Sequence, residues 1–494
     1  MNKIIGKPLD RVDGRLKVTG EAPYTADVPI ENLTYGVIFQ SAIACGKIIQ
    51  IDISAAIAVP GVLDIVTYQQ TPSLLKIPFF APQQPPPTEK DNNIYYDGQH
   101  LGIVIAQTLE QAETAASRVK IIYEEAAPTV TVADAEIFEP ESIFFGMMPG
   151  KITRGDVELG KALADVLLEQ HYTTPMEHHN PLEANGTIAI WEGDNLTLYE
   201  TTQGISATQR AIASVLNIPQ ENVRVISKYL GGGFGCKALL RSHTILAAIA
   251  SRQVKRPVKV VLTRAQMYTS CGHRSQTQQQ LTLGATKEGK LTVINHIGTS
   301  QTSLFDDFVE PVGVATTMMY ACPNLEIKYR LARINTGTPT FMRGPGEATG
   351  MFALESAMDE LAYALNIDPI ELRLINHADI EPHKGLPWSS KSLKQCYQKG
   401  AEIFGWLQRN PVPRSMRDNH FLIGWGMASA TFPSNSRTAS VKVKIFASGE
   451  VKVQSGTQDI GTGTNGTKKS YKPCCIGITS INALVAVGAW LRSL

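Results

Sequence analysis

Four glycines fall within the five residues Gly231–Gly235, and this run constrains the possible fold more than any other feature of the chain. The segment 222–230 before it predicts a strand, and the segment 238–252 after it predicts a helix. Glycine tolerates positive φ and lets the backbone approach another group closely. A helix that begins directly after the run would also offer free N–H groups to an anion or an oxo group. The run therefore predicts a ligand-approach loop, although a tight strand–helix turn that binds nothing has the same pattern.

Two better-known glycine loops do not match this segment. A P-loop needs G-x-x-x-x-G-K followed by Ser or Thr, but Cys236 replaces the second glycine and Ala238 replaces the hydroxyl residue. A dinucleotide fingerprint, G-x-G-x-x-G, counted from Gly231 also has Cys236 at its third glycine. An ordinary nucleotide-binding enzyme is therefore disfavoured. Next to Lys237, at an expected helix start, Cys236 would have a lowered thiol pKa, unless it is simply a small residue of the loop.

The rest of the chain mixes predicted strands and helices, which indicates an α+β fold. Helices are expected at 108–120, capped by Thr108, and at 206–216 and 350–365. Strands are expected at 35–40, 48–53, 101–106, 121–124, 439–446 and 450–455, together with a hairpin at 187–199.

The bulk composition excludes several kinds of protein. A length of 494 residues allows about two to four domains of ordinary size. The net charge of +1 would not draw the chain to nucleic acid or to an anionic membrane. Its seven cysteines include no C-x-x-C pair, so structural zinc or iron–sulfur ligation by this chain alone is not expected. Residues 1–15 lack a signal-peptide core, and free thiols fit a reducing cytoplasm, although export with a partner subunit stays open.

Five segments, the glycine run among them, occur in a definite order: K-V-T-G with Y-T-A-D at 17–27, T-T-Q-G at 201–204, G-G-G-F-G-C-K at 231–237, M-R-G-P-G-E-A at 342–348, and G-T-Q-D-I-G-T-G-T at 456–464. In this order the chain, from Gly6 to Thr464, resembles the molybdenum-cofactor subunits of the aldehyde oxidase/xanthine dehydrogenase family. The resemblance implies an α/β hammerhead domain at 1–132, a connector at 133–150, a first molybdopterin-binding domain at 151–400, the start of a second at 401–464, and a divergent, non-native tail at 465–494.

The resemblance also implies roles for individual residues. The metal would be held by molybdopterin, as such or in a dinucleotide form, so no side chain is expected to ligate it. The Gln203 amide would donate to an oxo ligand of the metal, and Phe234, Arg343 and Glu347 would line the substrate pocket. The residues expected to bind the cofactor are Gln203, Gly232, Gly233, Phe234, Gly235, Arg343, Gly461, Thr462 and Gly463.

The implied activity is a hydroxylation of aldehydes or purine-like N-heterocycles with water as the oxygen source. Because cysteine ligand clusters are missing here, electrons would leave through an iron–sulfur subunit and an FAD subunit. Carbon-monoxide-oxidising members carry Cys directly after the loop arginine, and Gly344 stands there instead. Glu177-His178-His179 lacks the i, i+4 spacing of a helical zinc pair, which favours a structural or pocket-lining role.

The resemblance ends at Thr464. Family chains continue into a G-x-G-E-type loop with the catalytic glutamate, and no such loop follows here. We therefore expect a truncated or frameshifted product that retains little molybdenum and turns over slowly. The alternative is an inactive remnant or an assembly protein that keeps only the N-terminal domains. The apolar stretch Ile476–Trp490 is shorter than the ~20 residues that span a bilayer, so no membrane helix is expected.

Overall fold

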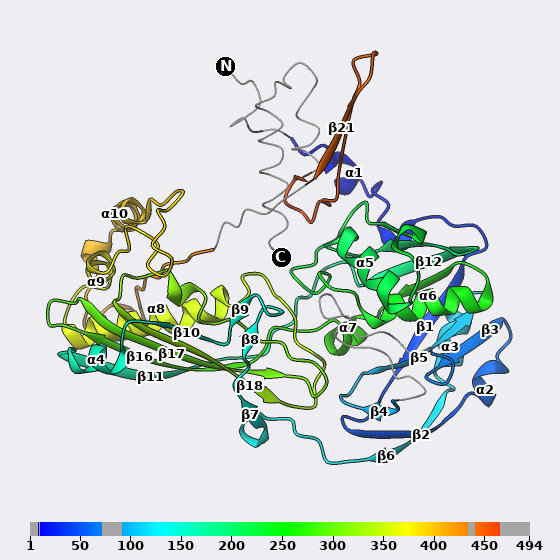
Figure 1. Cartoon of the computed structure of the whole chain (residues 1–494), viewed down its shortest axis with the longest axis horizontal. Coiled ribbons are helices and arrows are strands. Elements are labelled where there is room, and N and C mark those ends of the chain that lie inside the picture. The colour runs from blue at the N-terminus through cyan, green and yellow to red at the C-terminus, as the bar shows by residue number, and fades with distance from the viewer. Residues whose placement is uncertain (1–7, 9, 72–90, 433–439, 465–494) are drawn as a thin grey trace.

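The computed structural model describes residue 8 and residues 10–71, 91–432 and 440–464. These residues form two lobes, each built on one large β-sheet (Figure 1). Helices and strands are mixed along the chain, which confirms the expected α+β class. The predicted tail at 465–494 lies outside the described residues.

The first lobe contains a seven-stranded sheet in the order β14-β13-β12-β15-β1-β5-β3. Its strands are β1 (Thr34–Gln40), β3 (Val62–Thr67), β5 (His100–Ala106), β12 (Gly186–Glu192), β13 (Asn195–Glu200), β14 (Val223–Ile226) and β15 (Val258–Val261). β5 is buried along its whole length, as its unbroken apolar run predicts. Because β1 pairs in parallel with β15, strands from both sides of the expected connector at 133–150 share one sheet.

Three helices cover this sheet: α3 (Leu109–Ala116), α5 (Ile205–Val215) and α6 (Ser242–Val254). The predicted cap of α3 is confirmed, because the Thr108 hydroxyl accepts a hydrogen bond from the Gln111 amide at 3.3 Å. A smaller sheet lies beside the lobe, formed by β4 (Asn93–Ile94), β2 (Gly46–Asp52) and β6 (Lys120–Glu125), with the short helix α2 (Ser54–Ile57).

The second lobe has a six-stranded sheet, in which the path β10-β18-β17-β16-β11 carries β7 at the side of β18. The strands are β7 (Glu136–Phe138), β10 (Lys151–Arg154), β11 (Val166–Thr174), β16 (Thr277–Ala285), β17 (Leu291–Thr302) and β18 (Asn324–Arg333). The helix α8 (Glu347–Leu365) packs on β11 and β16, and α4 (Val157–Ala162) packs on β17 and β18. α9 (Pro369–Ile375) packs on α8.

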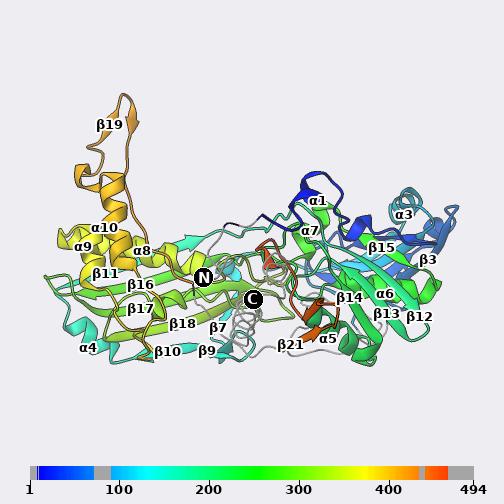
Figure 2. The same cartoon turned by 90° about the horizontal axis from the view of Figure 1, so that it is seen from above.

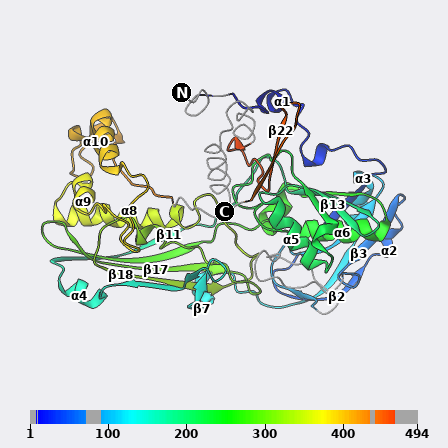
Figure 3. The same cartoon turned by 45° about the horizontal axis from the view of Figure 1, so that its top comes forward.

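Several smaller elements extend from the lobes. α10 (Leu393–Phe404) leads to an arm that ends in β19 (Arg417–Asp418) and β20 (Phe421–Leu422) and projects away from the second sheet (Figure 2). β21 (Val441–Ile445) and β22 (Val451–Ser455) form a separate two-stranded hairpin (Figure 3), and the short helix α1 (Gly14–Val18) lies near the N-terminus. The remaining elements are α7 (Arg264–Ser270), β8 (Ser142–Ile143) and β9 (Met148–Pro149). Among the described helices, none has the length and apolarity that crossing a membrane requires.

The structure corrects the prediction that a helix begins directly after the glycine run. β14 ends at Ile226, and α6 begins only at Ser242, so the run lies within a long loop. Residue Arg241 is extended and buried, and its Nε donates to the Cys236 carbonyl at 3.1 Å, which holds this part of the chain out of a helix. By contrast, α5 begins one residue after Gly204, and α8 begins at Glu347 rather than at residue 350.

The register of the second sheet gathers several connections at one end. Thr174, Thr277, Ser300 and Leu331 lie next to one another across β11, β16, β17 and β18. The chain segments that follow or precede these residues therefore leave the sheet at the same end: 175–183, 271–276, 303–310 and 334–346. In the first sheet, Gly186 lies opposite Val261, and Thr187 lies opposite Glu200. The segments at 180–185, 201–204 and 227–237 leave that sheet together.

We expect the buried Arg373 on α9 to be a main stabilising residue of the second lobe. Its guanidinium donates to Glu355 Oε2 at 2.9 Å and lies 2.8 Å from Asp359 Oδ1, with the arginine side chain fully buried. Arg373→Met leaves the buried Glu355 carboxylate, and the partly exposed Asp359, without their partner, which should cost about 3–5 kcal/mol. Thermal unfolding of this variant would measure the loss.

Arg330→Met is the matched control, because Arg330 pairs with Glu139 at 3.1 Å on the surface. Exposed pairs contribute only about 0–1 kcal/mol, so this variant should unfold close to the wild-type temperature. Equal destabilisation by the two substitutions would contradict the assignment.

Candidate active site

The glycine loop, residues 231–237, lies between the two lobes and touches other loops at close range. A Cβ on Gly235 would lie 1.8 Å from the Phe341 carbonyl oxygen, and one on Gly233 would lie 2.5 Å from Gln203 Oε1. Both positions therefore require glycine, and Gly235 also has a φ of +119°. Phe234 has a φ of +54° and is 46% exposed, so its ring stands out from the loop.

Gln203 is bound directly to the glycine loop. Its backbone N–H donates to the Lys237 carbonyl, and its side-chain Oε1 accepts from the Gly235 N–H, each at 2.8 Å. The first contact closes the loop, and the second fixes which end of the amide faces it. Among the described residues, the Gln203 Nε2 group has no hydrogen-bond partner, so it is available as a donor beside Gly235.

Lys237 and Glu183 form an ion pair that anchors the glycine loop. Glu183 was not among the residues that the sequence predicted for the site. Lys237 Nζ lies 3.0 Å from Glu183 Oε2 and donates to the Glu183 carbonyl at 2.9 Å, with the lysine side chain fully buried. Glu183 Oε2 also accepts from the Gly231 N–H at 2.8 Å. The pair thus ties both ends of the loop to the segment before β12. Glu183 and Lys237 lie 54 positions apart, so no local sequence pattern predicts their contact.

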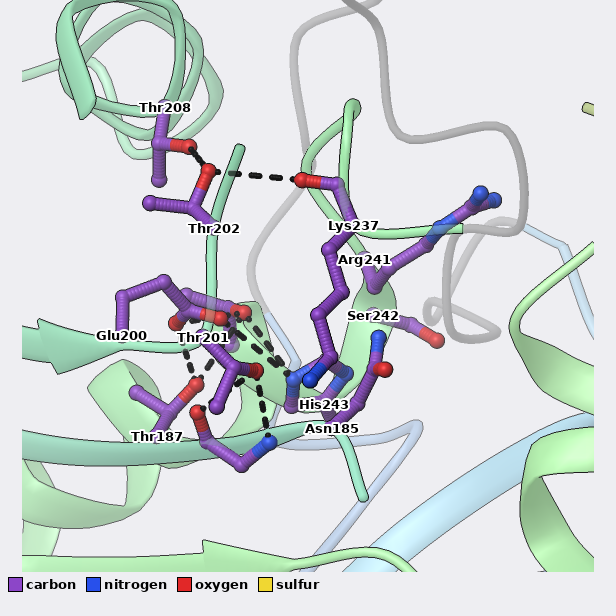
Figure 4. Close-up of polar contacts among 12 residues, drawn as sticks. Asn185, Thr187, Glu200, Thr201, Thr202, Thr208, Lys237, Arg241, Ser242 and His243 are labelled. Carbon is purple, nitrogen blue, oxygen red and sulfur yellow. Dashed lines mark hydrogen bonds and ion pairs between the residues drawn. The ribbon is translucent and has the colours of Figure 1, made fainter. Parts of the chain in front are cut away.

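A buried polar cluster lies under the T-T-Q-G segment (Figure 4). The hydroxyls of Thr187 and Thr244 both donate to Glu200 Oε2, and His243 Nε2 lies 3.7 Å from Glu200 Oε1. Thr202 Oγ1 contacts the Lys237 carbonyl at 3.4 Å (Figure 4). The cluster joins the end of β13 to α6 and to the glycine loop, and so supports the backbone that carries Gln203.

The segment Arg343–Glu347 forms the opposite wall. The Arg343 N–H donates to the Phe234 carbonyl at 2.9 Å, which brings two of the predicted site residues together. The Arg343 side chain is exposed, whereas Glu347 is 8% exposed and its Oε2 has no hydrogen-bond partner among the described residues. Burial raises the pKa of Glu347 to about 7, and the nearby Glu310 carboxylate adds to the rise.

The segment Gly461–Gly463, predicted to bind the pterin, is tied to the N-terminal segment. The N–H groups of Gly461 and Gly463 donate to Asp459 Oδ1 at 2.9 and 3.2 Å, so this carboxylate already occupies them. Arg11 donates to the Gly461 carbonyl at 2.9 Å, and its guanidinium lies 3.7 Å from Asp459 Oδ2. A phosphate at these amides would therefore have to replace Asp459.

The structure places His178 and His179 in the wall of a small pocket that Cys236 and Tyr268 also line. His179 Nε2 lies 2.7 Å from the Phe341 carbonyl, and burial lowers its pKa to about 4. In the described part of the chain, no three His, Cys, Asp or Glu side chains are arranged to hold a metal ion. The expected lowering of the Cys236 thiol pKa is wrong, because burial raises it to about 11.

Comparison with known proteins identifies both halves of this arrangement. A family model described as the aldehyde oxidase and xanthine dehydrogenase a/b hammerhead domain matches residues 19–127. A model described as the molybdopterin cofactor-binding domain matches residues 137–377. The chain belongs to the aldehyde oxidase and xanthine dehydrogenase family. The expected order, a hammerhead domain followed by a molybdopterin-binding domain, is confirmed.

Individual relatives agree with this family. The chain is 37% identical over 468 residues to the aldehyde oxidoreductase molybdenum-binding subunit PaoC of Escherichia coli, a match that covers 94% of this chain and 62% of the relative. It is 29% identical to the putative xanthine dehydrogenase molybdenum-binding subunit XdhA of the same species, covering 92% and 64%. The chain thus spans somewhat less than two thirds of the length of these relatives.

Solved structures share the fold. The quinoline 2-oxidoreductase of Pseudomonas putida superposes with a TM-score of 0.78 at 20% identity, over 95% of this chain and 64% of that chain. The aldehyde oxidoreductase of Desulfovibrio gigas superposes with a TM-score of 0.72 at 23% identity, over 81% and 46%. The two-lobed arrangement is therefore the fold of this family.

The raised pKa of Glu347 predicts how the stability of this family member varies with pH. Between pH 4.5 and about pH 7, this carboxyl is ionised in the unfolded chain but protonated in the folded protein, so folding takes up a proton. Stability from Glu347 is thus fully present below pH 4.5 and is lost as the pH rises through 7. Glu347→Gln should therefore stabilise the protein at pH 8.5, by on the order of 1–3 kcal/mol, and have little effect at pH 4.5.

Thermal unfolding at the two pH values measures this difference. Glu402→Gln, an exposed position on α10, controls for the loss of one negative charge and should change neither midpoint. A Glu347→Gln effect of the same size at both pH values would show that the carboxyl does not titrate in this range.

Proposed function

We propose that this chain is the molybdenum-cofactor part of an oxidoreductase that hydroxylates aldehydes or N-heterocycles, with water as the oxygen source. The observation that carries the proposal is the meeting of Gln203, the glycine loop and Arg343–Glu347 at one place between the lobes. The printed names of the relatives, an aldehyde oxidoreductase subunit and a xanthine dehydrogenase subunit, support this reaction class. The higher identity to the first favours aldehydes.

The residues present fit molybdopterin. The Gln203 Nε2 group, which has no partner among the described residues, suits a cofactor that holds its own metal and needs donors around it. The glycines allow this approach, since a side chain at Gly233 or Gly235 would displace Gln203 or Phe341. When bound, molybdopterin would supply the redox-active metal centre at which a substrate carbon is oxidised.

The chain's own groups would then orient and enclose the substrate. Gln203 Nε2 would donate toward the cofactor, and the exposed Phe234 ring would form an apolar wall for an aldehyde or an aromatic heterocycle. Glu347 would present a polar atom to the substrate and, with its pKa of about 7, could hold or release a proton near neutral pH. We propose iron–sulfur and FAD subunits as the electron-accepting partners, and a cytoplasmic location.

Substitution of Gln203 tests the proposal. Gln203→Glu keeps an oxygen that accepts from Gly235 but replaces the Nε2 donor with a negatively charged acceptor. Loss of a hydrogen bond to a charged group should reduce molybdenum and pterin content per folded chain by about 10- to 100-fold. Metal analysis and pterin fluorescence, on protein expressed with the cofactor-assembly machinery, give both contents.

The control is Gln408→Glu, an exposed glutamine outside the site, which should retain the wild-type content. Aldehyde-dependent dye reduction, measured on the same preparations, should follow the cofactor content. Stoichiometric molybdenum and full aldehyde turnover in Gln203→Glu would refute the assigned role of this residue. A wild-type chain that takes up no molybdopterin would refute the proposed function and would favour the alternative of an inactive remnant or an assembly protein.

A further inference from the structure

We propose that Arg274, together with the buried Glu310, is the positioning residue that holds the loop Arg343–Glu347 against the glycine loop. The inference rests on the proposed function for what this loop binds, but the geometry that supports it comes from this chain alone. Neither residue belongs to any of the sequence motifs.

Arg274 lies where the chain passes between the lobes, in the segment from α7 to β16. It is 3% exposed, and its guanidinium donates to four partners. Nη2 donates to the Arg343 carbonyl at 2.7 Å, and Nη1 donates to Glu310 Oε1 at 3.0 Å and to the Gly344 carbonyl at 3.3 Å. Nε donates to Glu177 Oε2 at 2.9 Å.

Glu310 holds the same loop at its other end. Its side chain is fully buried, and Oε1 accepts from the Gly346 N–H at 2.9 Å and from the Thr349 hydroxyl at 3.2 Å. Arg274 therefore binds the carbonyl groups before Pro345, and Glu310 binds the N–H group after it. The ion pair between Arg274 and Glu310 fixes the distance between these two sets of hydrogen bonds.

The loop needs such support because of its own sequence. Gly344 and Gly346 have φ values of +70° and +82°, and glycines at such positions leave a free loop with many accessible conformations. Any shift of the loop would also move the glycine loop, since the Arg343 N–H donates to the Phe234 carbonyl and Gly235 lies against Phe341.

Arg274 also places the third wall of the site. Its backbone pairs with Glu177, with N–H to carbonyl distances of 2.9 and 3.3 Å. This pairing fixes the start of the segment that reaches Glu183, whose carboxylate binds Gly231 and Lys237. Arg274 thus orients the loop opposite the glycines through its guanidinium, and it positions the Glu177–Glu183 segment through its backbone and its Nε contact with Glu177. A lysine could not replace it, because an ammonium group lacks the planar fork that reaches several acceptors.

Hydrogen exchange of the chain without cofactor tests the inference directly. In Arg274→Lys and Glu310→Gln, peptides covering 341–349 and 231–237 should exchange about 10- to 100-fold faster, as expected when a hydrogen bond to a charged group is lost. Peptides of β12–β13 and β16–β18 should exchange as in the wild type. Arg333→Lys is the matched control, because Arg333 pairs with the exposed Asp307. This variant should leave the exchange rates of both loops unchanged.

Unchanged exchange in the two loops would overturn the inference, and so would a rise spread equally over both sheets, which would mark Arg274 as a general stabilising residue. On cofactor-loaded protein, Arg274→Lys should raise the KM for an aldehyde by about ten-fold with a smaller change in kcat, because the pocket wall is displaced. Wild-type KM together with wild-type molybdenum content would also overturn it. Failure of the wild-type chain to bind molybdopterin would refute the proposed function, while the exchange result would still decide the role of Arg274.

Discussion

The site depends on the close backbone contact between two loops that leave different sheets. Gly235 lies so near the Phe341 carbonyl that no side chain fits between them, and the Arg343 N–H donates to the Phe234 carbonyl. A contact of this kind tolerates little movement, because packed backbones have no flexible side chain to absorb a shift. The relative position of the two lobes therefore determines the shape of the space between them.

Buried charged groups maintain that contact. Glu183 with Lys237 supports the glycine loop, and Arg274 with Glu310 supports the opposite loop. Burying such pairs carries a large desolvation cost, and apolar residues of similar size would often be at least as stable. Here each charge also binds backbone N–H or carbonyl groups of a loop, which apolar side chains could not do. We interpret these pairs as determinants of loop geometry more than of overall stability.

The glycine segments of the family motifs differ in what their N–H groups bind. At Gly231 and Gly235 the partners are the side chains of Glu183 and Gln203, so the loop is already ordered without a ligand. At Gly461 and Gly463 the partner is Asp459, which Arg11 contacts from the N-terminal segment. Preorganised donors and acceptors lower the conformational cost of binding, which is the property a cofactor site requires.

Much of the local structure followed from the sequence by itself. Apolar periodicity and capping residues placed β5, the hairpin of β12 and β13, and α3 with its Thr108 cap, because these signals act between near neighbours. The order of five motifs indicated the family. The hypotheses of truncation and of a non-native tail concern residues that the structure does not describe, and they stay predictions.

Only the tertiary structure decided the rest. The glycine run is followed by a loop rather than a helix: the buried Arg241, itself in extended conformation, donates to the Cys236 carbonyl, and α6 begins only after it. Burial of Cys236 by the packing of the whole chain raises the pKa of its thiol, which the sequence could not indicate. Arg274 and Glu310 belong to no motif, since the partners of their side chains lie 36 to 97 positions away and local sequence carries no record of such distances. Propensity acts over a few residues, whereas the partner of a buried charge is chosen by the packing of the whole chain.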